Sequence, residues 1–131
     1  MADAEFLQAH SRQANADHLA GLAAECALKA LIAGFLGGYV NPNDRVVHPD
    51  TGTPITMHVN LLWPEMSTIV RSRSASTLMT VLTTEPFATW KVDERYSDGS
   101  HLSPNTVSER IVAARAVVGI LEQAHIDGVL S

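Results

Sequence analysis

Apolar residues recur at helical spacing near both ends of the chain, and the pattern between them is irregular. A short amphipathic helix is expected over residues 4–13. Asn15 or Asp17 is then suited to cap a second helix, because a side-chain oxygen at that position accepts one of the free backbone N–H groups. This helix is expected to continue to Leu36, where the glycines at 37–38 favour the left-handed turn that ends a helix.

The second helix is apolar on two faces and carries one narrow polar line. Its three strongly polar side chains, at offsets of seven and four residues, fall within about 40° of one another on a helix: His18, Glu25 and Lys29. A helix of this kind belongs in the middle of a bundle. The polar line either borders a pocket or pairing surface, or it is the solvent edge, where Glu25 and Lys29 form a helix-supporting i,i+4 pair.

The middle of the chain is expected to hold two shorter helices and two irregular segments. Residues 38–58 form a long irregular connection, in which Pro-Asp-Thr-Gly at 49–52 favours a small hairpin. Residues 77–82 fit a short helix or a strand, and we favour a helix because the neighbouring segments are helical. A brief extended piece is expected around Trp90 and Val92. A third helix is expected over residues 60–72, with these side chains inward: Leu61, Leu62, Met66, Ile69 and Val70.

The last helix has the clearest boundaries. Ser103 and Pro104 suit its start, since proline is tolerated at the first helical position, and Gly128 suits its end. Its expected inner stripe is Val107, Ile111, Ala114, Val118, Leu121 and His125. The predicted fold class is therefore all-α, in one domain over residues 1–131.

Composition narrows the class of protein. The chain has 131 residues, 46% hydrophobic, which is enough for one domain with a core. The net charge of −5 argues against binding nucleic acid by bulk charge. A single cysteine, an N-terminus without a basic region and a longest apolar stretch of about half a membrane span predict a cytoplasmic protein that does not enter the membrane.

Cofactor and metal chemistry is not expected from the motifs. No glycine-rich phosphate loop follows a predicted strand, so we expect no nucleotide cofactor of the NAD or ATP type. His48, Asp50 and His58 match no metal-ligand spacing, and we expect no metal site.

Three segments resemble the HEPN family, the higher eukaryotes and prokaryotes nucleotide-binding domains. Residues 18–32, an Ala-rich helix with Glu25 followed by Leu-Lys-Ala-Leu, resemble the signature helix of that family. The run that begins at His58 resembles the start of its third helix, and residues 90–96 resemble its Arg-Tyr segment before the last helix. The resemblance implies a four- to five-helix up-and-down bundle, usually dimeric. Members act as metal-independent endoribonucleases, as toxins beside a nucleotidyltransferase-like antitoxin, or as non-catalytic modules.

The resemblance also suggests candidate site residues. HEPN ribonucleases carry Arg and His four to six residues apart, and this spacing occurs at Arg12 and His18 and at Arg95 and His101. A bend at Asp98-Gly99 would let the second pair converge, with His101 as general base on a ribose 2′-hydroxyl and Arg95 steadying the phosphate. Tyr96 stands where active members commonly have Asn.

A structural role for the same arginine competes with the catalytic one. Arg95 would then pair with Glu25 and tie the loop to the central helix, with Tyr96 over the join. Together with His18 and Lys29, these residues would line a small anion-binding pocket or hold the bundle.

Three functions are therefore carried forward. The first is a HEPN-like module that binds nucleotide or RNA phosphate, or a partner protein, as a homodimer; the second is an endoribonuclease; the third is an interaction domain without a ligand. The basic patch at residues 71–74 discriminates among them. If it faces the loop of Arg95 and His101, the first two functions gain support, and otherwise the third does.

Overall fold

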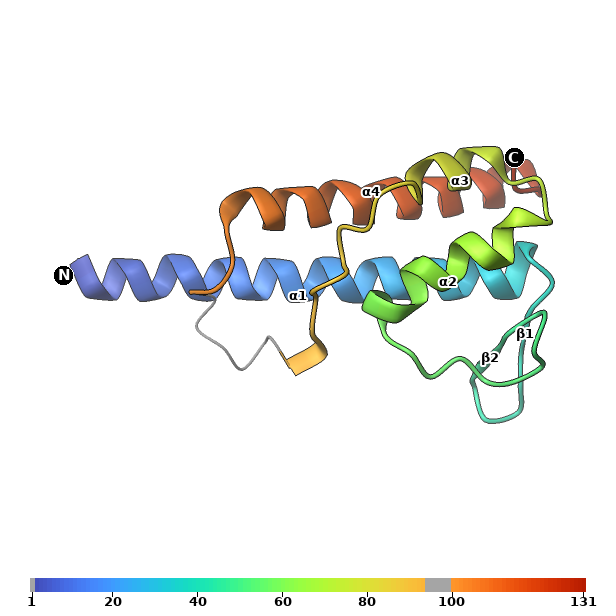
Figure 1. Cartoon of the computed structure of the whole chain (residues 1–131), viewed down its shortest axis with the longest axis horizontal. Helices are drawn as coiled ribbons and strands as arrows, with labels where there is room; N and C mark the ends of the chain where they lie inside the picture. The colour runs from blue at the N-terminus through green and yellow to red at the C-terminus, as the bar shows by residue number, and fades with distance from the viewer. Residues whose placement is uncertain (1, 94–99) are drawn as a thin grey trace.

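The three longest of the four described helices run in the same direction (Figure 1). The computed structural model describes residues 2–93 and 100–131, with side chains from Ala9 onward. The helices are α1 (Ala2–Phe35), α2 (Val59–Arg71), α3 (Ser76–Val81) and α4 (Pro104–Asp127), and the strands are β1 (Tyr39–Val40) and β2 (Val46–Val47). The prediction of an all-α fold class is confirmed.

The expected up-and-down order of helices is wrong. The first part of α1 contacts the first part of α4, where Asp17 meets Arg110, and the ends of both helices meet at Phe35 and His125. The start of α2 likewise lies beside the middle of α1, through a hydrogen bond from Val59 to α1, and its end lies near the end of α1 (Figure 1). Up-and-down bundles need short loops, whereas here α1 and α2 are each followed by a connection long enough to return to the starting end.

α1 is one continuous helix, and no second helix begins within it. Asn15 is exposed in mid-helix, and Asp17 is buried there in an ion pair, so neither residue is a cap. The helix ends as predicted at Gly37, whose φ of 87° is left-handed. By length and composition alone, residues 9–35 could cross a membrane, but half of the most apolar window is buried within the fold, as expected of a core helix.

The long connection after α1 is partly ordered into short strands. β1 and β2 pair antiparallel, with Tyr39 opposite Val47, and this first hairpin was not predicted. Val47 also bridges Pro54 across the turn at residues 49–52, where Gly52 has a φ of 71°. The predicted hairpin at that turn is therefore confirmed.

The two shorter helices, α2 and α3, lie where helices were predicted, but the buried residues of α2 differ from the predicted ones. α3 is helical, as favoured, while Trp90 ends a turn rather than lying in an extended piece. In α2, Leu61 is 61% exposed although it was expected inward, and Trp63, which was not on the expected list, is 1% exposed. The Trp63 indole N–H donates to the Thr84 carbonyl at 2.6 Å, so a buried aromatic holds the return segment.

The ends of α4 match the prediction, and its inner face matches in part: Val107 and Ala114 are buried, whereas His125 is exposed. Ser103 accepts a hydrogen bond from the Thr106 N–H and Gly128 has a φ of 75°. The buried residues are Val107, Arg110, Ala113, Ala114, Val117 and Ala124. The inner face is thus rotated from the expected stripe toward Arg110, Ala113 and Val117, because small apolar residues surround the helix and do not fix its buried side.

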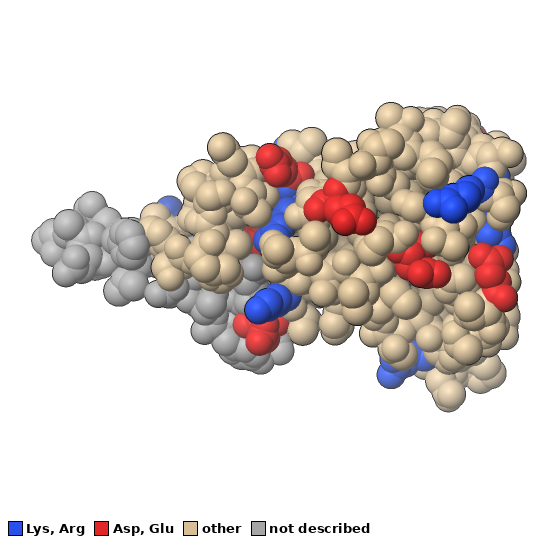
Figure 2. All heavy atoms as spheres, in the orientation of Figure 1, with Lys and Arg blue, Asp and Glu red and all other residues tan. Residues whose placement is uncertain are grey.

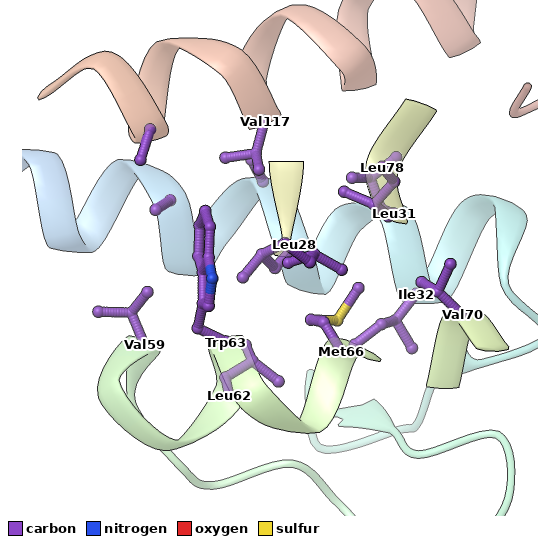
Figure 3. Packing of buried hydrophobic residues seen from close by; sticks show 14 of the residues in the cluster. Leu28, Leu31, Ile32, Val59, Leu62, Trp63, Met66, Val70, Leu78 and Val117 are labelled. Atoms are coloured by element: carbon purple, nitrogen blue, oxygen red, sulfur yellow. The ribbon is translucent and has the colours of Figure 1, made fainter. Parts of the chain in front are cut away.

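The main core lies where α1, α2, α3 and α4 meet (Figure 3). Leu28, Leu31 and Ile32 from α1 pack against Trp63 and Met66 from α2, all of them buried. Burying such side chains stabilises the fold by about 1.5–3 kcal/mol each. The core therefore fixes α1 as the central element on which the polar sites are built.

Candidate functional site

The polar line of α1 is mostly buried, which contradicts its interpretation as a solvent edge. His18 and Glu25 are buried, and Lys29 is about a quarter exposed. The two halves of the line contact different parts of the protein. His18 faces the segment around Trp90, whereas Glu25 and Lys29 lie at the start of α2.

His18 belongs to the packing around Trp90. The two rings stack with centroids 5.9 Å apart and an interplanar angle of 11°. The Trp90 indole N–H donates to the Asp17 carbonyl at 2.9 Å. Gly21 makes room for the indole, because a Cβ at that position would lie 2.0 Å from a Trp90 ring carbon. The predicted role of His18 in ligand binding has no support from these contacts.

A buried ion pair joins α1 to α4 next to this packing. Arg110 donates to Asp17 Oδ2 at 2.7 Å, and the two side chains are 2% and 0% exposed. The same guanidinium donates to the Pro86 carbonyl and to Thr89 Oγ1, each at 2.8 Å. Arg110 therefore ties three segments together, although it was not among the predicted site residues. A polar residue in the middle of the apolar helix face was the available signal.

Glu25 holds the start of α2. Its Oε1 accepts hydrogen bonds from the Val59 N–H at 3.0 Å and from His58 Nδ1 at 3.1 Å, and its Oε2 binds Lys29 Nζ at 3.2 Å. The predicted i,i+4 pair of Glu25 and Lys29 is confirmed. Because a buried carboxylate here satisfies a free N–H at the helix N-terminus, it replaces a local cap. His58, the N-cap residue, makes no side-chain cap bond of its own.

The Glu25–His58 pair orients an imidazole at the surface. A carboxylate can only accept, so Nδ1 of His58 carries the hydrogen and the neutral ring keeps its lone pair on Nε2. Nearly half of the His58 side chain is exposed. The arrangement can transfer a proton at Nε2. His58 does not line either of the two grooves described below.

The predicted catalytic pair is only partly visible. Arg95 and Tyr96 lie outside the described residues, and so does the bend at Asp98-Gly99. His101 is described and exposed, just before the start of α4. The convergence of Arg95 with His101, and its pairing with Glu25, stay predictions.

The basic patch at residues 71–74 lies at the other end of the molecule from His101. It follows α2, close to the end of α1, whereas His101 precedes the start of α4 (Figure 1). Arg73 is also occupied, because its two terminal nitrogens donate to the two carboxylate oxygens of Asp50 at 3.3 and 2.7 Å. The hydrogen bond from Arg73 lowers the pKa of Asp50 below its ordinary value.

His48 anchors the hairpin and is not part of a metal cluster. Its Nδ1 accepts from the backbone N–H groups of Asp50 and Thr51, so its Nε2 is the donor to Glu65 on α2 at 2.9 Å. Within residues 2–93 and 100–131, no three potential metal ligands lie together.

An open apolar groove runs between α1 and α4. It has a volume of about 460 Å³ and lies between residues 16–23 of α1 and residues 111–122 of α4. They are Ala16, Leu19, Ala20, Ala23, Ile111, Ala114, Arg115, Val118, Gly119 and Glu122. A second groove of about 770 Å³ lies between α4 and residues 80–86.

The outer α1/α4 face is defined here as the exposed line of α1 (Ala16, Leu19, Ala23, Cys26, Ala30, Gly34) together with the α4 side of the groove (Ile111, Arg115, Val118, Gly119, Glu122). Leu19 is 54% exposed and Cys26 is exposed. The α1 line contains no charged residue. The apolar faces of α1 were predicted from the sequence, but the exposure of one of them was not.

Comparisons with known proteins give no further guidance, since no family model, no curated protein and no solved structure matches this chain significantly.

Proposed function

We propose that this chain is a helical interaction module that self-associates through the outer α1/α4 face. The observation that carries the proposal is Leu19, a leucine that is 54% exposed on an uncharged helix line and lines an apolar groove. The proposed occupant of the face is a second copy of the chain. Homodimerisation was already expected from the HEPN resemblance.

The distribution of charge on α1 supports this function. A helix that borders water normally carries polar side chains on its wet face. Between residues 19 and 35 of α1 the only charged residues are Glu25 and Lys29, and their contacts with each other and with the start of α2 place them off the outer face. An apolar surface left in this way is typical of a protein–protein interface.

The charge on the rest of the molecule supports protein binding over phosphate binding. On the face shown in Figure 2, the described Lys and Arg side chains are scattered and do not form one patch. Arg73 is paired with Asp50, and the patch at residues 71–74 lies far along the molecule from His101. Nucleotide or RNA binding, ribonuclease activity and a nucleotidyltransferase-like partner stay predictions of the resemblance, whose up-and-down topology this fold does not share.

The test is the oligomeric state of the wild-type chain and of Leu19→Glu, measured by sedimentation equilibrium. We expect the wild type to dimerise and Leu19→Glu to be monomeric, because a buried unpaired carboxylate opposes association. Leu61→Glu is the matched control: Leu61 is a leucine on α2 with 61% exposure, and its variant should dimerise like the wild type. A wild-type chain that is monomeric at every concentration contradicts the proposal.

A further inference from the structure

The α4 side of the outer face carries one positive and one negative side chain, and a two-fold rotation can place each opposite its counterpart of unlike charge in a second copy. Ile111, Arg115, Val118 and Glu122 follow one another at spacings of four, three and four residues, as residues on one helix face do. Arg115 and Glu122 are both exposed. They are seven residues apart, which places their Cα atoms about 10.5 Å apart along the helix.

We infer that two copies of the chain pair antiparallel along α4. The two-fold axis lies between the two α4 helices, perpendicular to both, at the level between Val118 and Gly119. This inference rests on the proposed function and adds its geometry. With the axis there, Arg115 of each copy lies opposite Glu122 of the other. An isologous interface makes every such contact twice, so each dimer gains two reciprocal ion pairs.

The remaining residues of α4 fit the same axis. Half-buried Ile111 comes opposite Ile126 of the other copy, and Ile126 is 78% exposed in the single chain. Gly119 lies beside the axis, and a Cβ built on it meets nothing within 4 Å. A residue without a side chain beside the axis allows the two helices to approach closely. The pairing therefore covers the exposed Ile126. It also gives a role to Gly119, because a glycine inside a helix otherwise lowers the stability of the helix.

The position of the axis on α1 follows from the contacts between the two helices. Asp17 contacts Arg110, and Phe35 contacts His125. A residue of α1 therefore lies at the level of the α4 residue that is 90 to 93 positions later in the sequence. An axis midway between 118 and 119 on α4 then passes α1 close to residues 26–28. Cys26 is exposed at this level, so the two copies of this cysteine should lie near each other across the axis.

Charge reversal tests the pairing. Arg115→Glu and Glu122→Arg each place like charges opposite one another twice per dimer, and each should raise the dimer Kd at least about tenfold. The double variant Arg115→Glu/Glu122→Arg restores opposite charges and should return the Kd to within about threefold of the wild type. Glu109→Arg, an exposed change of the same charge on the side of α4 that lines the second groove, is the matched control and should leave the Kd unchanged.

A second measurement uses the native cysteine. A short bis-maleimide should link Cys26 to its counterpart in the wild-type dimer and in the double variant, and much less in either single variant. If the wild type dimerises but the double variant does not regain affinity, or Cys26 does not cross-link, this pairing is overturned while self-association stands. If Leu19→Glu and the wild type are both monomeric, the proposed function itself fails.

Discussion

The buried ion pair between α1 and α4 makes the strongest stability prediction. Replacing Asp17 by Asn keeps the size of the side chain but leaves the Arg110 guanidinium, 2% exposed, without its counter-charge. Removing one partner of such a pair costs about 3–5 kcal/mol. Arg110 keeps its bonds to Pro86 and Thr89, so we expect Asp17→Asn to lie at the lower end, about 3 kcal/mol.

Urea unfolding followed by circular dichroism measures this loss. With an m-value of about 1–3 kcal/mol/M, the midpoint should fall by about 1–3 M. Asp93→Asn, at an exposed position, is the control and should change the free energy of unfolding by less than about 0.5 kcal/mol. The double variant Asp17→Asn/Arg110→Met removes both charges and should be more stable than the sum of the single losses implies. A loss below about 1 kcal/mol in Asp17→Asn would show that the guanidinium does not depend on this carboxylate.

Three further predictions concern other contacts. Gly21→Ala should destabilise by about 1–3 kcal/mol in thermal unfolding, because its Cβ would overlap a buried indole ring; Gly34→Ala, where a Cβ meets nothing, should stabilise by about 0.5–1 kcal/mol, and equal effects would contradict the packing. Glu25→Ala should cost about 1–3 kcal/mol and increase amide exchange at the start of α2, since it leaves a buried N–H without an acceptor; unchanged exchange would refute this role. The pKa of Asp50 is lowered in the folded protein, so its pairing with Arg73 stabilises the fold at pH values above the ordinary pKa of 3.8 and loses this effect as the pH falls through the lower folded pKa. The difference in stability between the wild type and Asp50→Asn should therefore shrink on acidification. A difference that stays constant with pH would contradict this pairing.

Local signals in the sequence predicted the helices well. The caps at Ser103 and Gly128 and the stop at Gly37 depend on backbone geometry that only a few residue types satisfy, and all three are found. The direction of the helices was not predictable in the same way. It depends on where the long connections, residues 36–58 and 72–103, return the chain, and local patterns carry no information on that.

The polar residues were the harder part of the candidate site. Arg110 was not singled out, because charged side chains are rarely buried unless they are paired, and its partner Asp17 is 93 positions away. Glu25 was correctly singled out, but its contact with Val59 across the long connection could not be deduced from either segment alone. Buried polar residues are thus placed by long-range partners, which a periodicity analysis does not contain.

The parallel course of α1 and α4 has a consequence for how the chain folds. Contacts between residues about 90 positions apart complete the core, and forming them requires closing a long loop first. Chains dominated by such distant contacts fold more slowly than helical bundles with local contacts. During synthesis, α2 covers part of α1 first, and the side of α1 that packs against α4 stays exposed until α4 has been made. The return connections that align the helices therefore leave the newly made α1 exposed to aggregation until the last helix is available.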